Sequence, residues 1–228
     1  MKPLKKSAIL LGATGLTGRI LLDLLLKDDV YEKIKLFSRT SIGFTHPKIE
    51  EHLIDLLQLE NYGKAFTGHE VFCCIGTTKK KTPDNETYRK IDFGIPVAAA
   101  KLAKQNNINT IIIISALGAD AKSAVFYNKI KGEMENAVIA EKIANTHILQ
   151  PSLIGGDRSE KRVGEWLFKQ VMKVLGFMLV GNLAKYKTIE PETIAKAMLW
   201  LANNSYENLK IESDQIKKIG SEYDRNRT

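Results

Sequence analysis

Short apolar runs, rich in β-branched residues, alternate along the chain with longer stretches in which apolar residues recur at helical spacing. The apolar runs predict strands at residues 8–11, 34–37, 52–55, 71–75, 110–115 and 147–150. The run 111–114 consists of four isoleucines, which is typical of a central strand covered on both faces. Such alternation indicates parallel strands joined by right-handed crossover helices. We therefore predict an α/β fold with a doubly wound parallel sheet of the Rossmann-like, NAD(P)-binding type.

The pattern becomes less regular beyond Pro151. Helical spacing continues at residues 164–174 and 191–202, and the polar tail is expected to fray after Ile219. Earlier, Pro96 interrupts the helical stretch 85–105 and is expected to bend it or start it. A chain of 228 residues with 44% hydrophobic residues suffices for one buried core. We predict a single domain, residues 1–228, in which a small irregular C-terminal portion, 151–228, lies on the substrate side.

The charge pattern argues against nucleic-acid binding. The formal net charge is +8, but Lys and Arg are spread along the chain and form no basic stripe. No apolar run is long enough to span a membrane, and the Lys-rich start leads directly into a strand, so we expect no membrane binding and a cytoplasmic location. The apolar stretch 163–183 is interrupted by Lys169 and Lys173 and is expected to pack on the protein or on a second subunit.

Cysteine and histidine usage indicates neither a structural disulfide nor a metal site. Cys73 and Cys74 are the only cysteines, and they are adjacent within an apolar run. Neighbouring cysteines cannot form an ordinary structural disulfide with each other or a four-ligand metal site. The four histidines are scattered. We therefore interpret both cysteines as core residues and expect no metal.

A glycine-rich turn lies between the first strand and the helical stretch 20–26. Gly12, Gly15 and Gly18 suit a tight turn, a close approach of the backbone to a pyrophosphate, and close packing of helix on strand. The phosphates would rest on the amides at the positive end of the new helix. A purely structural turn is the alternative. The intervening and following residues complete the predicted contact set: Thr14, Leu16, Thr17 and Arg19.

The residues after the second strand favour NADP(H) over NAD(H). NAD-binding folds place an acidic residue near this point, whereas NADP-binding folds place an arginine there for the 2′-phosphate. Here the sequence reads Ser38-Arg39-Thr40, although a surface arginine at a strand end is also common. After the third strand, Asp55, followed by Leu56, could accept from the adenine amino group or act as a helix N-cap.

Ser115, Tyr127 and Lys131 carry the predicted chemistry. Ser115 ends the isoleucine strand, and Tyr127 and Lys131 are four residues apart, on one face of a helix. A tyrosine beside an ammonium has a lowered pKa and can exchange a proton with a carbonyl oxygen. The lysine can also hold the nicotinamide ribose, and the serine hydroxyl can polarise the carbonyl. An ordinary surface pair on a helix is the alternative.

With these three residues the chain resembles the short-chain dehydrogenase/reductase superfamily. Residues 12–19, 72–78, 127–132 and 157–166 resemble its atypical members, the mammalian Tat-interacting oxidoreductase with its bacterial and fungal relatives. The resemblance implies NADP(H) binding and a cofactor cleft lined by Cys74, Ile75, Gly76, Thr77, Pro151, Ser152, Leu153 and Ile154. It implies no substrate. The asparagine of the superfamily's proton relay has no clear counterpart, and Asp92 lies near its place.

The sequence thus predicts an NADPH-dependent oxidoreductase that acts on an unidentified small carbonyl compound or alcohol. The alternative is an NADP(H)-binding regulatory or redox-sensing protein with little or no catalysis, which would act through a protein partner. A homo-oligomer is also open. A sugar-nucleotide epimerase or dehydratase would need a larger C-terminal substrate domain than the one that follows Pro151. A purely structural module would leave the glycine turn unexplained.

Overall fold

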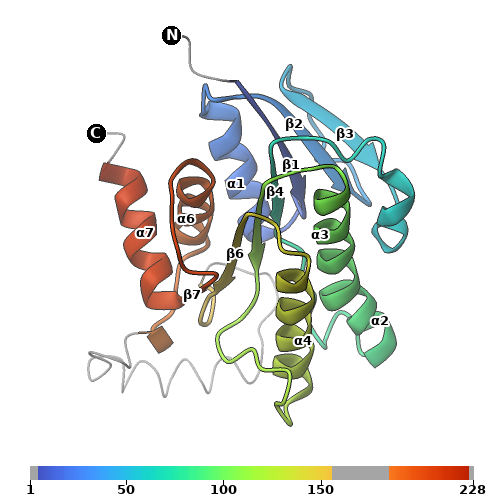
Figure 1. The fold of residues 1–228 in the computed structure, drawn as a ribbon, viewed down its shortest axis with the longest axis vertical. Helices are drawn as coiled ribbons and strands as arrows, with labels where there is room; N and C mark the ends of the chain where they lie inside the picture. Colours follow the sequence, from blue (N-terminus) through green and yellow to red (C-terminus); the bar gives the residue numbers. More distant parts are fainter. Residues whose placement is uncertain (1–4, 156–184, 226–228) are drawn as a thin grey trace.

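A seven-stranded parallel sheet forms the centre of the molecule in the computed structural model, which describes residues 5–155 and 185–225. The strand order is β3-β2-β1-β4-β5-β6-β7 (Figure 1). The strands are β1 (Lys6–Leu11), β2 (Tyr31–Ser38), β3 (Ile49–Leu53), β4 (Glu70–Cys73), β5 (Thr110–Ile114), β6 (Asn145–Gln150) and β7 (Lys210–Glu212). This order and direction confirm the predicted doubly wound fold. The six predicted strands are present, with ends displaced by up to three residues.

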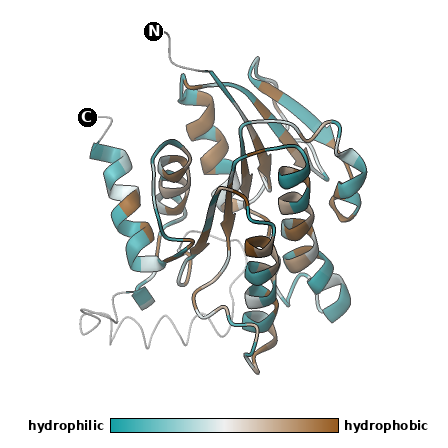
Figure 2. Ribbon diagram, in the orientation of Figure 1, coloured by the Kyte–Doolittle hydropathy of each residue, from teal (hydrophilic) through white to brown (hydrophobic). Residues whose placement is uncertain are grey.

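Helices cover both faces of this sheet (Figure 1). One face carries α1 (Leu16–Lys27) and α6 (Pro191–Asn203), and α7 (Ser213–Arg225) packs on α6. The other face carries η1 (Leu56–Tyr62), α3 (Ile95–Gln105) and α4 (Phe126–Ala140). Successive strand residues alternate between the two cores: Leu10 belongs to the first, and Ile9 and Leu11 to the second. Figure 2 shows the central strands as mainly hydrophobic, as expected for the part of a sheet that is buried on both sides.

The helical stretch around Pro96 is divided into three parts. It comprises α2 (Asn85–Arg89), the π-helical turn η2 (Lys90–Gly94) and α3. Pro96 lies in the first turn of α3, where its missing N–H costs no intrahelical bond. The proline therefore starts the regular helix, one of the two predicted outcomes. The π-helical turn buries the side chain of Asp92.

The C-terminal part of the chain is more regular than the sequence analysis predicted. The prediction of a tail that frays after Ile219 is wrong, because α7 continues to Arg225. Ile216, Ile219 and Tyr223 recur at helical spacing and are buried, so packing stabilises a segment whose composition is mostly polar. Strand β7 was not predicted. The assignment of residues 151–228 to the substrate side remains a prediction.

Two expectations concern residues that lie outside the described ranges. The helix at 164–174 and the packing of 163–183 lie in the part of the chain that the structure does not describe. Within the described ranges, no helix is both long enough and apolar enough to cross a membrane.

Cys73 is fully buried, and Cys74 is half-buried with its Sγ 3.9 Å from Met198 Sδ. Burial raises the pKa of the Cys73 thiol to about 11, so this thiol stays protonated at neutral pH.

Candidate functional site

The candidate site lies at the carboxyl edge of the sheet, where β1 and β4 are neighbours. The chain leaves β1 toward one face and β4 toward the other, so this is the switch point at which such sheets bind ligands. The backbone of Cys74 donates to Leu11 O at 2.9 Å, which joins the ends of the two strands. Residues 12–19 and 74–77 therefore meet here. Residues 151–154 follow β6 at the same edge, and Leu117 N donates to Pro151 O at 2.9 Å.

The glycine turn has the conformation that only glycine supports. Gly12 has a φ of +89°, in the left-handed region. A Cβ on Gly18 would lie 2.1 Å from Gly12 O, so any side chain there would push helix and turn apart. Gly15 is the N-cap residue of α1 and supplies no side chain to cap it. The first-turn amides are therefore left for another acceptor, which suits the pyrophosphate of a dinucleotide.

Several residues of the loop after β2 are bonded within the protein. Ser38 is buried and its Oγ donates to Thr40 O at 2.8 Å, so Ser38 shapes the turn. The guanidinium of Arg19 lies 4.8 Å from the ring centre of Phe44. Arg39 is exposed.

Asp55 acts as a helix cap in this structure. Its side chain accepts from Leu57 N at 3.0 Å at the start of η1. This is one of the two roles predicted for it. The carboxylate remains exposed, so a contact to the adenine amino group stays a prediction.

A buried ion pair lies beneath the loop that follows β4. Lys131 Nζ is 2.9 Å from Asp92 Oδ1, and both side chains are almost fully buried. Asp92 Oδ2 accepts from Thr77 N at 2.7 Å. A Cβ built on Gly76 would lie 3.7 Å from Asp92 Oδ1 and 3.9 Å from Lys131 Nζ, so glycine leaves space beside both charges. Burial lowers the pKa of Lys131, but attraction to Asp92 and Tyr127 outweighs it and raises that pKa above its ordinary value.

Tyr127 lies in the first turn of α4, four residues before Lys131, and its side chain is 40% exposed. The neighbouring Phe126 packs edge-on against Tyr88 at 5.5 Å, and Lys79 Nζ lies 4.6 Å from the Phe126 ring. The start of α4 is thus anchored while Tyr127 stays accessible. A phenol with these surroundings can reach a substrate.

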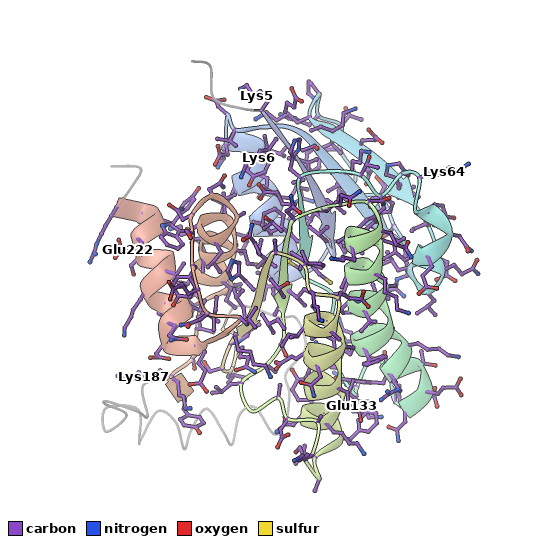
Figure 3. The ribbon with its side chains drawn as sticks, in the orientation of Figure 1. Lys5, Lys6, Lys64, Glu133, Lys187 and Glu222 are labelled. Atoms are coloured by element: carbon purple, nitrogen blue, oxygen red, sulfur yellow. The ribbon has the colours of Figure 1, made fainter. Side chains whose placement is uncertain are left out.

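Ser115 is held inside the protein by a carboxylate that the sequence analysis missed. Its Oγ donates to Glu135 Oε1 at 2.5 Å, and Glu135 is fully buried. Glu135 also accepts from Gln150 Nε2 at 2.9 and 3.0 Å and pairs with Lys210 Nζ at 2.8 Å. The available signal was spacing, because Glu135 follows Lys131 by four residues on the same helix face. Figure 3 labels Glu133, which lies two residues before Glu135 in α4.

A hollow lies at the amino edge of the sheet, opposite the edge that carries the candidate site. Its volume is about 520 Å³, and Ser7, Lys33, Glu50 and His69 are among its lining residues. Its polar groups bond to one another, as in the 3.1 Å ion pair of Lys33 with Glu50 and the 2.9 Å bond from Ser7 N to His69 Nδ1. Since its lining residues lie at the opposite edge of the sheet, this hollow is separate from the site around Tyr127. Within the described residues, no three His, Cys, Asp or Glu side chains lie close enough together to hold a metal ion.

The chain is similar to a known protein family over most of its length. Residues 12–154 match a family described as NAD(P)H-binding. Protein HTATIP2 of Rattus norvegicus is 32% identical over 198 residues, which are 85% of this chain and 80% of that protein. Protein FMP52, mitochondrial, of Meyerozyma guilliermondii is 31% identical in an alignment of 232 positions that covers 95% of this chain and 96% of that protein.

The solved structures agree on the fold. A UDP-glucose 4-epimerase from Thermotoga maritima, crystallised with UDP-glucose, superposes with a TM-score of 0.66 at 13% identity, covering 95% of this chain and 82% of that one. At this identity the likeness concerns the fold alone.

The comparisons correct the prediction of a cytoplasmic location. That prediction is wrong, because the fungal relatives are named as mitochondrial proteins. It rested on the lack of a recognisable secretory signal, and this lack carries no information about import into an organelle.

Proposed function

Because the chain belongs to the NAD(P)H-binding family, we propose that it is an NADPH-dependent oxidoreductase of the short-chain dehydrogenase type that acts on a small carbonyl compound or alcohol. One observation carries the proposal. An accessible phenol, Tyr127, lies one helical turn from a buried ammonium, Lys131, at the sheet edge where this fold takes its nucleotide. Bound NADPH would supply the hydride.

The residues at this edge fit the proposed cofactor. The uncapped first turn of α1 offers amides to the pyrophosphate. Asp92 Oδ1 is buried, and its partner is the ammonium of Lys131, whose Nζ lies 2.9 Å away. Gly76 leaves space next to this oxygen. Lys131, held in place by Asp92, would bind the nicotinamide-side ribose beside Gly76.

The preference for NADP(H) over NAD(H) is part of the proposal. Arg39 is exposed directly after β2, and neither of its neighbours, Ser38 and Thr40, is acidic. A guanidinium at this point can form a charge-assisted pair with a 2′-phosphate. An acidic residue there would repel that phosphate.

Tyr127 would act as the general acid in reduction. Its O–H gives the proton to the carbonyl oxygen as that oxygen gains negative charge, and in the reverse direction the phenolate takes the proton from the alcohol. Lys131 stabilises the phenolate through its positive charge. Ser115 could polarise the carbonyl only by giving up the hydrogen bond to Glu135.

The position of Ser115 also favours a second candidate. The only hydrogen of the Ser115 hydroxyl is donated to Glu135, and Lys131 is buried, so Tyr127 alone of the three predicted groups is exposed in this arrangement. An NADP(H)-binding regulatory or redox-sensing protein, acting through a protein partner with little or no catalysis, does not need three groups that face a substrate.

A carbonyl panel separates the two candidates. NADPH absorbance is followed with aldehydes, ketones and quinones for the parent chain, for Tyr127→Phe and for Tyr62→Phe. Tyr62 is a partly exposed tyrosine of η1 and serves as the control. We expect Tyr127→Phe to lose about 10²- to 10⁴-fold in rate at nearly unchanged NADPH affinity, and Tyr62→Phe to retain activity. NADPH binding without turnover on any compound would favour the regulatory candidate.

A further inference from the structure

The fold places the carboxylate of Asp92 against Lys131 by means of an irregular helical turn. Asp92 belongs to η2, the π-helical turn between α2 and α3, and it is 0% exposed. A π-helical turn inserts an extra residue into a helix, and such turns are frequent at functional sites. Here the turn brings the carboxylate under the loop that follows β4, where Thr77 N also donates to it. Asp92 therefore links α4 to that loop.

The charge of Lys131 depends on this carboxylate. Burial alone disfavours an ammonium and lowers its pKa, and Lys131 is only 3% exposed. The groups that face it are Asp92 from η2, Tyr127 from its own helix and Cys73 from β4. Cys73 is a neutral thiol at neutral pH, since its pKa is about 11, and Tyr127 is partly exposed to water. Asp92 is thus the strongest opposing charge, and without it burial would dominate.

We propose that Asp92 is a positioning residue that keeps the Lys131 ammonium charged and fixed beneath Gly76, so that Lys131 can hold the cofactor ribose. The inference rests on the proposed NADP(H) binding at this edge and not on turnover. A direct carboxylate–ammonium pair sets the charge of the lysine as well as its position.

The test is the pH dependence of NADPH binding, which needs no substrate. Dissociation constants are measured by NADPH fluorescence for the parent chain, Asp92→Asn and Lys131→Met. Asparagine still offers an oxygen to Thr77 N but carries no charge. Glu86→Gln is the control, because Glu86 is an exposed acid of α2 that pairs with Lys90. The ratio of variant to parent is used at each pH, since ionisation of the cofactor phosphate then cancels.

We expect Asp92→Asn to bind within about threefold of the parent near pH ~6 and to fall by about tenfold near pH ~9, as the pKa of the buried lysine drops into this range. At the higher pH it should match Lys131→Met, and the double variant should show no further loss. Glu86→Gln should follow the parent throughout. If Asp92→Asn does not fold, Asp92→Ser removes the same charge with a smaller polar side chain and allows the same comparison.

The inference is overturned if the affinity ratio of Asp92→Asn is independent of pH, or if Lys131→Met binds NADPH as well as the parent. These results are distinct from failure of the proposed enzyme activity. A chain that reduces no carbonyl compound but shows the expected pH dependence would still support the Asp92–Lys131 unit, and active enzyme with pH-independent binding would refute it.

Discussion

The hydroxyl of Ser115 donates to the carboxylate of Glu135, with Oγ and Oε1 2.5 Å apart, in a part of the protein that water does not reach. Gln150 donates to the same carboxylate, and Lys210 forms an ion pair with it. The ends of β5 and β6 and the start of β7 are thereby joined to α4 below the candidate site. Glu135 therefore supports the site without facing it.

Replacing Glu135 should destabilise the fold. Glu135→Ala leaves the Ser115 O–H and the Gln150 side-chain N–H buried without their acceptor, and each loss costs about 1–3 kcal/mol. We expect the free energy of unfolding, measured by urea denaturation, to fall by about 2–5 kcal/mol. Lys33→Ala is the control, because both side chains of the Lys33–Glu50 pair are exposed, by 52% and 36%, and its loss should cost about 1 kcal/mol or less. Equal losses for the two variants would contradict the assignment of Glu135 as the centre of the cluster.

Two glycine substitutions separate close packing from backbone strain. Gly18→Ala places a methyl group 2.1 Å from Gly12 O, so the turn must move and contacts to the cofactor phosphates are lost. Losing one such contact costs roughly 1.5–3 kcal/mol, which is about tenfold or more in NADPH affinity. Gly43 has a φ of +81° but open space around it, so Gly43→Ala should cost about 1–2 kcal/mol in stability and leave NADPH affinity unchanged. Similar affinities for both variants would count against the turn as a phosphate site.

Arg39 should discriminate between the two dinucleotides. Arg39→Ala removes the proposed partner of the 2′-phosphate, which should weaken NADPH binding by about 10- to 100-fold and leave NADH binding unchanged. Arg225→Ala, at an exposed arginine of α7, is the control. Titration of both reduced cofactors against the three proteins measures the effect. Equal affinity of the parent chain for NADPH and NADH would rule out the proposed preference.

His147 should make the fold sensitive to weak acid. Burial lowers the pKa of His147 below its ordinary value of 6.5. The unfolded chain therefore takes up a proton at a higher pH than the folded chain, and stability falls as the pH drops below about 6.5. His147→Asn, which keeps a donor for Asn208 O, should remove this part of the pH dependence. Urea denaturation at several pH values for both proteins tests this, because the contributions of the other histidines cancel in the difference. Parallel stability curves would refute it.

Much of the fold and part of the site could be predicted from local sequence. The strands alternate with helices because buried runs and helical spacing are properties of adjacent residues. The glycine turn was recognisable for the same reason, since Gly12 and Gly18 lie six positions apart between a strand and a helix. Tyr127 and Lys131 share a helix face because they are four residues apart. None of these features requires knowledge of distant parts of the chain.

The tertiary structure alone decided which charges meet. Asp92 and Lys131 come from different helices, and a π-helical turn that no periodicity predicts brings them together. Lys210 meets Glu135 because β7, only three residues long, pairs with β6. Helix α7 forms because its apolar stripe packs on α6. Helices and strands can be predicted from neighbouring residues, because their hydrogen bonds repeat at a fixed spacing along the chain. The pairing of buried charges depends instead on how the elements pack, since only packing removes the water that would otherwise separate them.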